Sequence, residues 1–239
     1  MTVGARIIIF VNPKVASIWL AVALQKNLLV EDLEVLHDGW VPRRCANTFN
    51  ILDRATSGVR ITLGSLWMHR PVIVERKYHP EWIFLMREPL SWVASYTALW
   101  MRMMKIKFTG GEAESGLGHG IRRVGRDLIA QAEALLCVLE HLGCQVDYWH
   151  MDHYTTEDGF KALAKSLRLE VRDPLVDFNH RWNGTNPAIK LNPSHWSNDL
   201  REELLTFWDA CPHLQDGYRR ATERMSEICE EPCHGTKSS

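Results

Sequence analysis

Runs of β-branched and aromatic residues along this chain predict strands that alternate with helices. Residues 6–11 are apolar without polar alternation, which is typical of a strand buried on both faces of a parallel sheet. A helix is expected to follow from Ser17 to Lys26. The same order recurs at 82–86, where the strand is followed by Pro89, a residue suited to the first position of a helix.

Further along the chain the pattern repeats once more and ends in helices. A strand is expected at 145–150, leading into a helix near 157–167. Two longer amphipathic stretches predict helices over 121–142 and 198–208. An earlier segment, 60–68, is expected to form another strand. The buried faces are expected to include Leu128, Ala132, Leu135 and Leu139 in one helix and Trp92, Tyr96 and Leu99 in the helix that begins at Pro89.

Strands that alternate with helices predict an α/β fold of three layers, α/β/α, around a central parallel sheet. The length of 239 residues fits a single domain spanning 1–239. In such folds, ligands bind beyond the carboxyl ends of the strands. Functional residues are therefore expected just after residues 11, 69 and 86.

Three segments do not follow the alternating pattern. Residues 106–120 are rich in glycine, and residues 179–197 contain asparagine, glycine and proline throughout. Long connections of this kind in a compact domain are often binding loops or lids, and disorder is the alternative. The end of the chain, 230–239, is expected to be a disordered tail.

Net charge and cysteine content narrow the functional classes. The formal charge of −1 and the pI near 6.8 give no broad basic field for nucleic acid or anionic membranes. No apolar run is long enough to cross a bilayer, and the six cysteines are scattered, so we expect a cytoplasmic protein. The cluster Cys229, Cys233 and His234 has no second ligand pair with zinc-like spacing, and no metal is expected.

The segment from Asn12 to Trp19 joins the first strand to its helix. Such a junction directs backbone N–H groups and the positive end of the helix dipole toward one point, which suits a phosphate. The segment lacks the Gly-x4-Gly-Lys-Ser/Thr pattern of nucleotide triphosphatases. Taken alone, the same residues are equally consistent with a plain strand-to-helix turn in which Lys14 is solvated and Trp19 is a core residue.

This segment resembles the 5′-phosphosulfate loop of sulfotransferases that use 3′-phosphoadenosine 5′-phosphosulfate (PAPS). The family pattern is Pro-Lys-x-Gly-Thr-Thr-Trp, with Pro-Lys-Val-Ala in some members. The resemblance implies that Lys14 contacts the leaving phosphate, that Trp19 lies against the adenine, and that the loop holds the phosphosulfate. The positions of this segment that match the family pattern are Pro13, Lys14, Val15, Ala16 and Trp19. Ser17 keeps a hydroxyl where the family has its first threonine, and Ile18 replaces the second threonine.

A second match lies at residues 87–96. The family binds the 3′-phosphate with an arginine at a strand end, a proline two residues later, and a serine eight residues after the arginine. Arg87, Pro89 and Ser95 reproduce that spacing, and Tyr96 supplies the adjacent aromatic residue. A guanidinium fork and a hydroxyl can share one phosphate. The alternative is that Arg87 pairs with Glu88 or Asp173 and that Ser95 is a small packing residue.

The acceptor must lose a proton during transfer, so a base is expected between the two phosphate sites. His69-Arg70-Pro71 is similar to the family's Lys-Thr-His-Leu-Pro strand end, which makes His69 the expected base, although Trp67 stands where the family has lysine. A structural role for His69 remains the alternative. His79 and His119 are further candidates for the base.

Late in the chain, Lys190 precedes Trp196 in a way that is similar to the family's basic loop over the 3′-phosphate, and Arg181 is a competing match. The run from Asp199 to Tyr218 also resembles the closing helix of soluble bacterial-type sulfotransferases. The resemblance implies sulfuryl transfer from PAPS to a hydroxyl or amine of a small-molecule acceptor. The state of assembly stays open, and a homodimer is one option. Two other classes stay open: a small-molecule kinase, for which Asp152 could bind the metal, and a non-catalytic module that binds adenosine bisphosphate.

Overall fold

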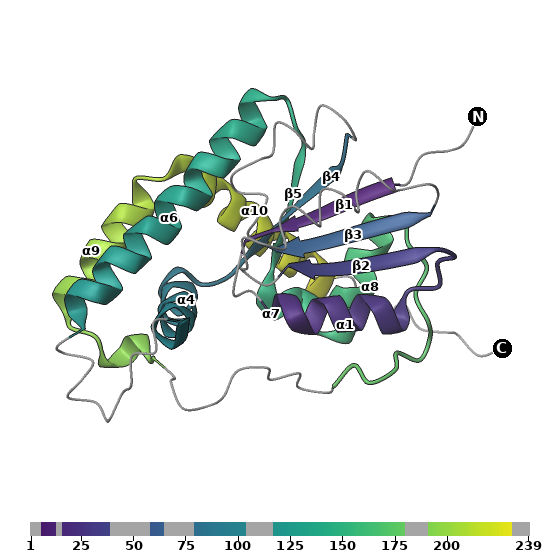
Figure 1. The fold of residues 1–239 in the computed structure, drawn as a ribbon, viewed down its shortest axis with the longest axis horizontal. Coiled ribbons are helices and arrows are strands. Elements are labelled where there is room, and N and C mark those ends of the chain that lie inside the picture. Colours follow the sequence, from purple (N-terminus) through teal and green to yellow (C-terminus); the bar gives the residue numbers. More distant parts are fainter. Residues whose placement is uncertain are drawn as a thin grey trace.

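The computed structural model describes residues 6–12, 16–38, 58–64, 79–103, 117–179 and 191–230. Its centre is a sheet in the order β2-β3-β1-β4-β5, in which every neighbouring pair is parallel (Figure 1). This confirms the predicted α/β class with a parallel sheet. The strands are β1 Arg6–Val11, β2 Leu33–Asp38, β3 Val59–Gly64, β4 Glu81–Met86 and β5 Val146–His150.

The helices lie on both faces of the sheet, as parallel strands require. Connections between parallel strands are right-handed, so crossovers that leave β1 and β4 in opposite directions place their helices on opposite faces. Figure 1 shows α1 beside β2, whereas α6 and α9 lie together on the other side of the molecule. The helices are α1 Ser17–Asn27, α4 Pro89–Met103, α6 Gly118–His141, α7 Met151–Tyr154, α8 Glu157–Ser166, α9 Asn198–Asp209 and α10 Pro212–Glu230, with a 3₁₀ turn η2 at Pro193–His195.

The central strands have the continuous burial that their sequences predict. Every residue from Ile7 to Val11 in β1 is at most 3% exposed, and Trp82 to Met86 in β4 are at most 2% exposed. Burying an aliphatic side chain of this size contributes roughly 1.5–3 kcal/mol relative to leaving it in water. The core around these two strands therefore fixes the edge at which their loops emerge.

Most predicted elements are confirmed, with small shifts of their ends. The helix expected at 121–142 is α6, which begins earlier at Gly118, so residues 118–120 of the segment expected to be a loop are helical. The strand expected at 60–68 is described from Val59 to Gly64. Strand β2 and the short helix α7 were not predicted.

The predicted buried stripe of α4 was partly wrong. Trp92 is 1% exposed, but Tyr96 and Leu99 are only half-buried. Helix α4 packs against both α6 and α9, and Trp92 meets Trp208 of α9 edge to face at 6.1 Å. Contacts on several sides widen the buried face, whose other members are Leu90, Val93, Ala94, Thr97 and Met101.

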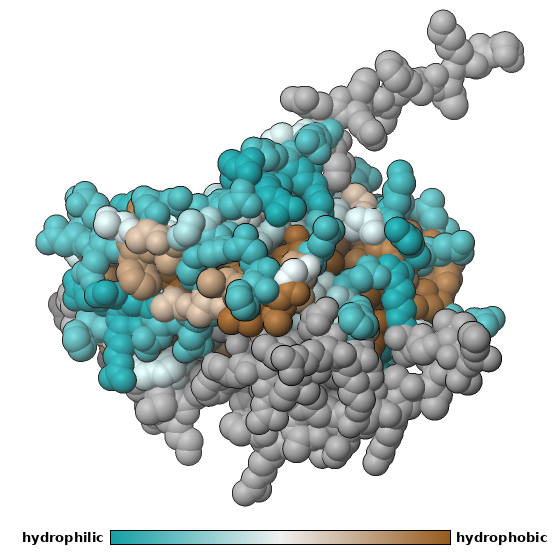
Figure 2. Space-filling view, turned by 90° about the horizontal axis from the view of Figure 1, so that it is seen from above, coloured by the Kyte–Doolittle hydropathy of each residue, from teal (hydrophilic) through white to brown (hydrophobic). Residues whose placement is uncertain are grey.

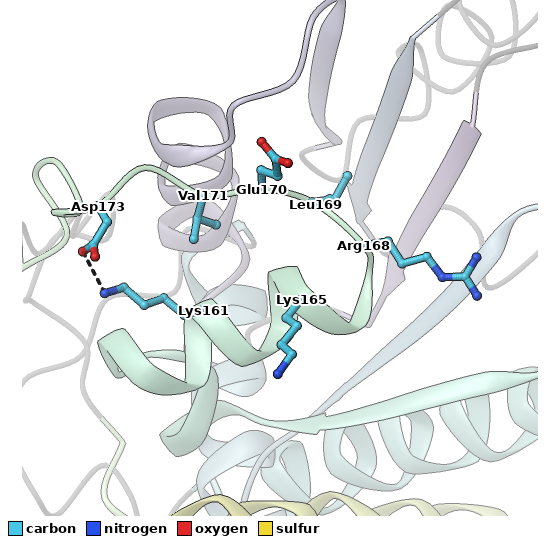
Figure 3. Close-up of a pocket in the computed structure, with 7 residues that line it drawn as sticks. All are labelled: Lys161, Lys165, Arg168, Leu169, Glu170, Val171 and Asp173. Atoms are coloured by element: carbon cyan, nitrogen blue, oxygen red, sulfur yellow. Dashed lines mark hydrogen bonds and ion pairs between the residues drawn. The ribbon is translucent and has the colours of Figure 1, made fainter. Parts of the chain in front are cut away.

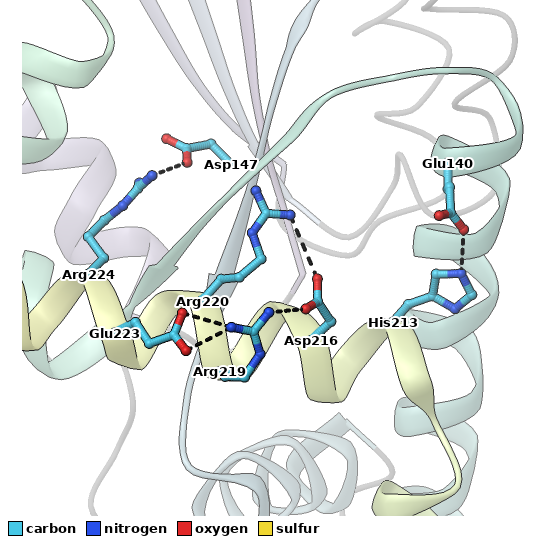
Figure 4. Close-up of polar contacts among 8 residues, drawn as sticks. All are labelled: Glu140, Asp147, His213, Asp216, Arg219, Arg220, Glu223 and Arg224. Atoms are coloured by element: carbon cyan, nitrogen blue, oxygen red, sulfur yellow. Dashed lines mark hydrogen bonds and ion pairs between the residues drawn. The ribbon is translucent and has the colours of Figure 1, made fainter.

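Helix α10 covers β5, the strand at one end of the sheet. The Arg220 guanidinium lies 4.9 Å from the ring centre of Tyr148, and that of Arg224 lies 4.4 Å from the ring centre of Trp149. Arg224 also forms an ion pair with Asp147 (Figure 4). Consecutive strand residues face opposite sides of a sheet, so α10 contacts β5 on both sides and protects this end of the sheet.

The first turn of α10 is fixed to α6 by a carboxylate. The backbone N–H groups of His213 and Leu214 donate to Glu133 at 3.2 and 3.0 Å. The His213 ring lies between Glu133 and Glu140, at 2.6 and 2.7 Å. The hydrogen bond to Glu133 raises the pKa of His213; partial burial opposes this shift, and the bond to Glu140 adds to it. A negative charge at a helix N-terminus is favourable, so α6 and α10 are held together at this point.

The described surface is mixed in character. Figure 2 shows one face on which hydrophobic areas come to the surface between hydrophilic residues. Within the described residues, no helix combines the length and apolar character needed to cross a membrane. Large exposed apolar side chains include Ile18, Leu29, Val138 and Val176.

We predict that Gly217→Ala loosens α10 from the sheet. A Cβ at position 217 would lie 2.4 Å from the Tyr148 ring, which is too close without a shift of the helix or the ring. We expect the free energy of unfolding to fall by about 1–3 kcal/mol, the usual range for overpacking. Urea unfolding followed by circular dichroism measures this change.

Gly120→Ala in α6 is the matched control, because a Cβ there meets no atom within 4 Å. Alanine is a better helix former than glycine by about 1 kcal/mol, so this variant should be at least as stable as the parent protein. Equal destabilisation by both substitutions would contradict the proposed contact between α10 and β5.

Candidate functional site

The two predicted phosphate loops begin on neighbouring strands. β1 pairs directly with β4 in the middle of the sheet, with Val11 opposite Phe84. From β1 the chain continues to β2 on one side, and from β4 it continues to β5 on the other. This is the topological switch point of the sheet, where the loops at the carboxyl ends diverge and where folds of this class bind ligands in a crevice. The candidate site lies at this point.

Asn12 ties the two loops together. It follows β1 directly, is 2% exposed and has a left-handed backbone with φ of 79°. Its Nδ2 donates a hydrogen bond to the carbonyl oxygen of Leu85 in β4. Its Oδ1 is buried and has no hydrogen-bond partner among the described residues. A buried acceptor without a partner is costly, so Asn12 offers an unused hydrogen-bonding group beside the crevice.

The N-terminus of α1 also has free bonding capacity. Ala16 precedes the helix in the left-handed region, with φ of 55°, and no side chain of the described residues caps the helix. Its first turn contains no acidic residue. Unbonded N–H groups and the positive end of the dipole make such a terminus suitable for an anion. The structure does not describe the three residues before Ala16, which are Pro13, Lys14 and Val15.

Ser17, the first residue of α1, contacts a histidine that sequence reasoning missed. The Oγ of Ser17 lies 3.0 Å from Nε2 of His37. His37 is near the carboxyl end of β2, whose residues pair with β3. Burial lowers the pKa of His37, and an interaction with its own backbone partly offsets this effect. The sequence signal for His37 was its position next to the last residue of a short strand, but strand β2 itself was not predicted.

The next two residues of α1 face different surroundings. Ile18 is 46% exposed. Trp19 is half-buried, and its ring meets Phe178 edge to face at 5.0 Å and Phe160 at 6.2 Å. The Nε1 of Trp19 donates to the Phe178 carbonyl at 3.3 Å. Trp19 therefore joins α1 to the segment that precedes residues 180–190.

Arg87 is the first residue after β4 and is half-buried. Burial lowers the pKa of the Arg87 guanidinium, and interactions with Asp152, Tyr154 and Glu88 act in the opposite direction. The guanidinium thus lies in a mixed environment at the carboxyl edge, next to the crevice. Asp173, which the sequence offered as a partner for Arg87, forms an ion pair with Lys161 at 3.0 Å.

Helix α4 carries its own cap. The Glu88 carboxylate accepts hydrogen bonds from the backbone N–H groups of Leu90 and Ser91, at 3.1 and 2.7 Å. These amides are therefore occupied by a residue of the chain itself. Ser95 lies six residues beyond Pro89, about 9 Å further along the helix axis, and is half-buried.

Other polar residues gather at the end of β5. His150, the last residue of that strand, is 5% exposed, and its ring lies 5.6 Å from that of Tyr218 in α10. Burial lowers the pKa of His150, while Asp152 raises it and Arg87 lowers it further. Asp152 follows β5 and is exposed. The sequence offered Asp152 as a metal ligand for a kinase, but it did not indicate that His150 and Tyr218 share this edge.

Four of the remaining candidate residues lie outside the part of the chain that the structure describes: Trp67, His69, Arg181 and Lys190. His79 precedes β4 and so lies at the opposite, amino edge of the sheet. His119 is exposed in the first turn of α6.

A shallow hollow elsewhere on the surface is lined by both charge types (Figure 3). Val171 bridges to Leu28, and the Arg172 N–H donates to the Asn27 carbonyl, so this hollow lies near the C-terminal end of α1. Helix α1 is about 16 Å long, which separates the hollow from Ser17. It is therefore distinct from the crevice, and its lining consists of Lys161, Lys165, Arg168, Leu169, Glu170, Val171 and Asp173.

We predict that Asn12→Ala destabilises the protein by about 2 kcal/mol, since it leaves the Leu85 carbonyl without its bond and puts alanine at a positive φ that asparagine tolerates better. Asn12→Gly loses the same bond but tolerates the backbone, so it should be less harmful by about 1 kcal/mol. Chemical unfolding of the three proteins measures both contributions. Variants as stable as the parent would contradict a structural role for the Asn12 side chain.

Comparison with known proteins gives one structural similarity to report. No protein-family model matches the chain, and no curated protein matches it in sequence. The structure is similar to the crystal structure of a sulfotransferase from Alicyclobacillus acidocaldarius, with a TM-score of 0.48 and 14% sequence identity. The match covers 93% of this chain and 99% of that chain.

Proposed function

We propose that the protein is a sulfotransferase that moves a sulfuryl group from PAPS to a hydroxyl or amine of a small-molecule acceptor. The observation that supports this most directly is that the two loops predicted to bind phosphates begin at adjacent strand ends joined by the Asn12–Leu85 hydrogen bond. One nucleotide with phosphates at both ends of its ribose could span these two loops. We place the reaction in the cytoplasm, with no metal.

The first loop is assigned to the phosphosulfate. Its proposed ligands are the backbone amides at the start of α1, those of Val15 and Ala16, and the side chains of Lys14 and Ser17. The acceptor oxygen attacks sulfur in line, and the bond from sulfur to the bridging phosphate oxygen breaks. Adenosine 3′,5′-bisphosphate leaves with that electron pair, and Lys14 stabilises the charge that develops on it.

The acceptor's proton goes to a base, for which we propose His69. A neutral imidazole near physiological pH can take this proton during the attack. The strand β3, which precedes His69 in the chain, lies next to β1, so the carboxyl end of β3 is near the first loop. A base near the carboxyl end of β3 would lie beside the sulfuryl group.

The second loop is assigned to the 3′-phosphate. Arg87 provides a guanidinium at the strand end, and we propose that Ser95 and Lys190 complete the site. Because Glu88 occupies the first amides of α4, this phosphate would be held by side chains. The half-buried ring of Trp19 retains partial exposure, which is compatible with contact to the adenine.

A kinase is disfavoured by the position of Asp152. It follows β5, which β4 separates from β1, so the strand ends are about 10 Å apart. A metal held by Asp152 would be closer to Arg87 than to the first loop. A non-catalytic bisphosphate-binding module is the second candidate, because Ile18 is 46% exposed where a phosphate-binding hydroxyl was expected.

We predict that adenosine 3′,5′-bisphosphate raises the melting temperature of the protein by several degrees at millimolar concentration, whereas ATP with Mg²⁺ does not. Arg87→Ala should weaken bisphosphate binding about tenfold or more, because it removes a charge-assisted contact. Calorimetric titration measures the affinity. Arg168→Ala, in the hollow near the other end of α1, is the matched control and should bind like the parent.

Two outcomes would refute this assignment. Stabilisation by ATP with Mg²⁺ in place of the bisphosphate would favour the kinase. Weak binding by the Arg168 variant, with normal binding by the Arg87 variant, would move the nucleotide to the hollow.

We further predict that His69→Ala keeps bisphosphate affinity within about twofold but lowers transfer at least about a hundredfold, because general base catalysis typically contributes that much. Transfer is measured with ³⁵S-labelled PAPS and a panel of small phenols, alcohols and amines. His119→Ala, on the exposed face of α6, serves as the comparison for the alternative base. If His69→Ala turns over normally and His119→Ala does not, the base is His119.

A further inference from the structure

Ser17 is the hydroxyl of the first loop, and its hydrogen-bonding state depends on His37. The two side chains are 3.0 Å apart, between Oγ and Nε2. They come from elements that pack together, because α1 lies against β2. Among the described residues, no side chain caps α1, and the first turn of the helix has no acidic residue.

The direction of this hydrogen bond determines what Ser17 can offer a ligand. A neutral imidazole that accepts at Nε2 receives a hydrogen bond from the Ser17 hydroxyl, so the hydroxyl hydrogen points toward His37. A protonated imidazole instead donates from Nε2 to Oγ, because both ring nitrogens then carry hydrogen. The Ser17 hydroxyl is then free to donate to an anion at the start of α1.

We propose that His37 is a positioning residue of the phosphate site at the N-terminus of α1, which takes up a proton as a phosphate group binds and turns the Ser17 hydroxyl toward it. This inference rests on the proposed function, because it concerns the same phosphate site. It adds a residue from β2 to a phosphate site otherwise assigned to the loop after β1. His37 acts through Ser17.

The surrounding charges favour such a change on binding. Burial lowers the pKa of His37, so the ring is mainly neutral near pH 7 in the absence of a ligand. A phosphate beside Ser17 would favour the imidazolium. Of the charged residues on the packed elements, Glu34 of β2 and Arg60 of β3 pair with each other, and Lys26 lies in the last turn of α1. Asp38 is the next residue of β2.

Calorimetric titration with adenosine 3′,5′-bisphosphate tests the proposal. Titrations at about pH 7 in buffers with different ionisation enthalpies give the number of protons taken up on binding. The phosphate groups of the ligand titrate as well, so the informative quantity is the difference between the parent protein and His37→Gln. Glutamine retains a hydrogen-bonding group near Ser17 but cannot take up a proton.

We expect His37→Gln to take up fewer protons than the parent and to bind about tenfold more weakly near pH 6, with affinities equal within about twofold near pH 8.5. Ser17→Ala should reproduce the lost affinity, and the double variant should add nothing further, because the two side chains act as one unit. His141→Gln, an exposed histidine at the end of α6, is the matched control and should behave like the parent.

The outcomes separate this inference from the function on which it rests. If the parent binds the bisphosphate and His37→Gln shows the same proton uptake and pH dependence, His37 has no such role, while the sulfotransferase assignment stands. If the parent does not bind the bisphosphate at all, both fail. Circular dichroism of His37→Gln establishes that it is folded, and His37→Asn provides a second variant without a titrating ring.

Discussion

The hydrogen bond from Asn12 to the Leu85 carbonyl joins the ends of two strands whose following segments must separate. From β1 the chain turns into α1 on one face of the sheet, and from β4 it turns into α4 on the other. Without a cross-link, the loops at such a switch point would be positioned only by the strands behind them. Asn12 is buried and carries the left-handed backbone that ends β1, so the bond, the turn and the crevice form one local structure.

How much of the fold could be predicted depends on how strongly each element is buried. β1, β4 and α6 have long apolar patterns because they pack on both faces or along a whole helix side, and the sequence predicts them well. β2 lies at an end of the sheet and mixes Leu33, Val35 and Leu36 with charged residues, so its half-buried pattern resembles a loop. Helix α7 has four residues, too few for any period to appear.

How much of the site could be predicted depends on how far apart its residues lie in the sequence. The residues of each loop are close in sequence, so motif spacing could indicate Ser17, Arg87 and Ser95 as candidates. Their neighbours come from remote strands: His37 is twenty positions from Ser17, and Asp152 is sixty-five positions from Arg87. No local pattern contains such pairs. They follow from strand order, which places the ends of β2 and β5 beside loops that come from β1 and β4.

The two helix N-termini at this edge differ in a way that separates their roles. Helix α4 is capped by Glu88, which occupies its first amides and adds a negative charge next to Arg87. Among the described residues helix α1 has no side-chain cap, it begins after a residue in the left-handed region, and the Oγ of its first residue, Ser17, lies 3.0 Å from Nε2 of His37. An anion at α4 must therefore be held by the guanidinium and nearby side chains, against the charge of Glu88. An anion at α1 would meet amides that no described side chain caps, so the group on which bonds break is best placed there, where fixed dipoles can stabilise charge as it develops.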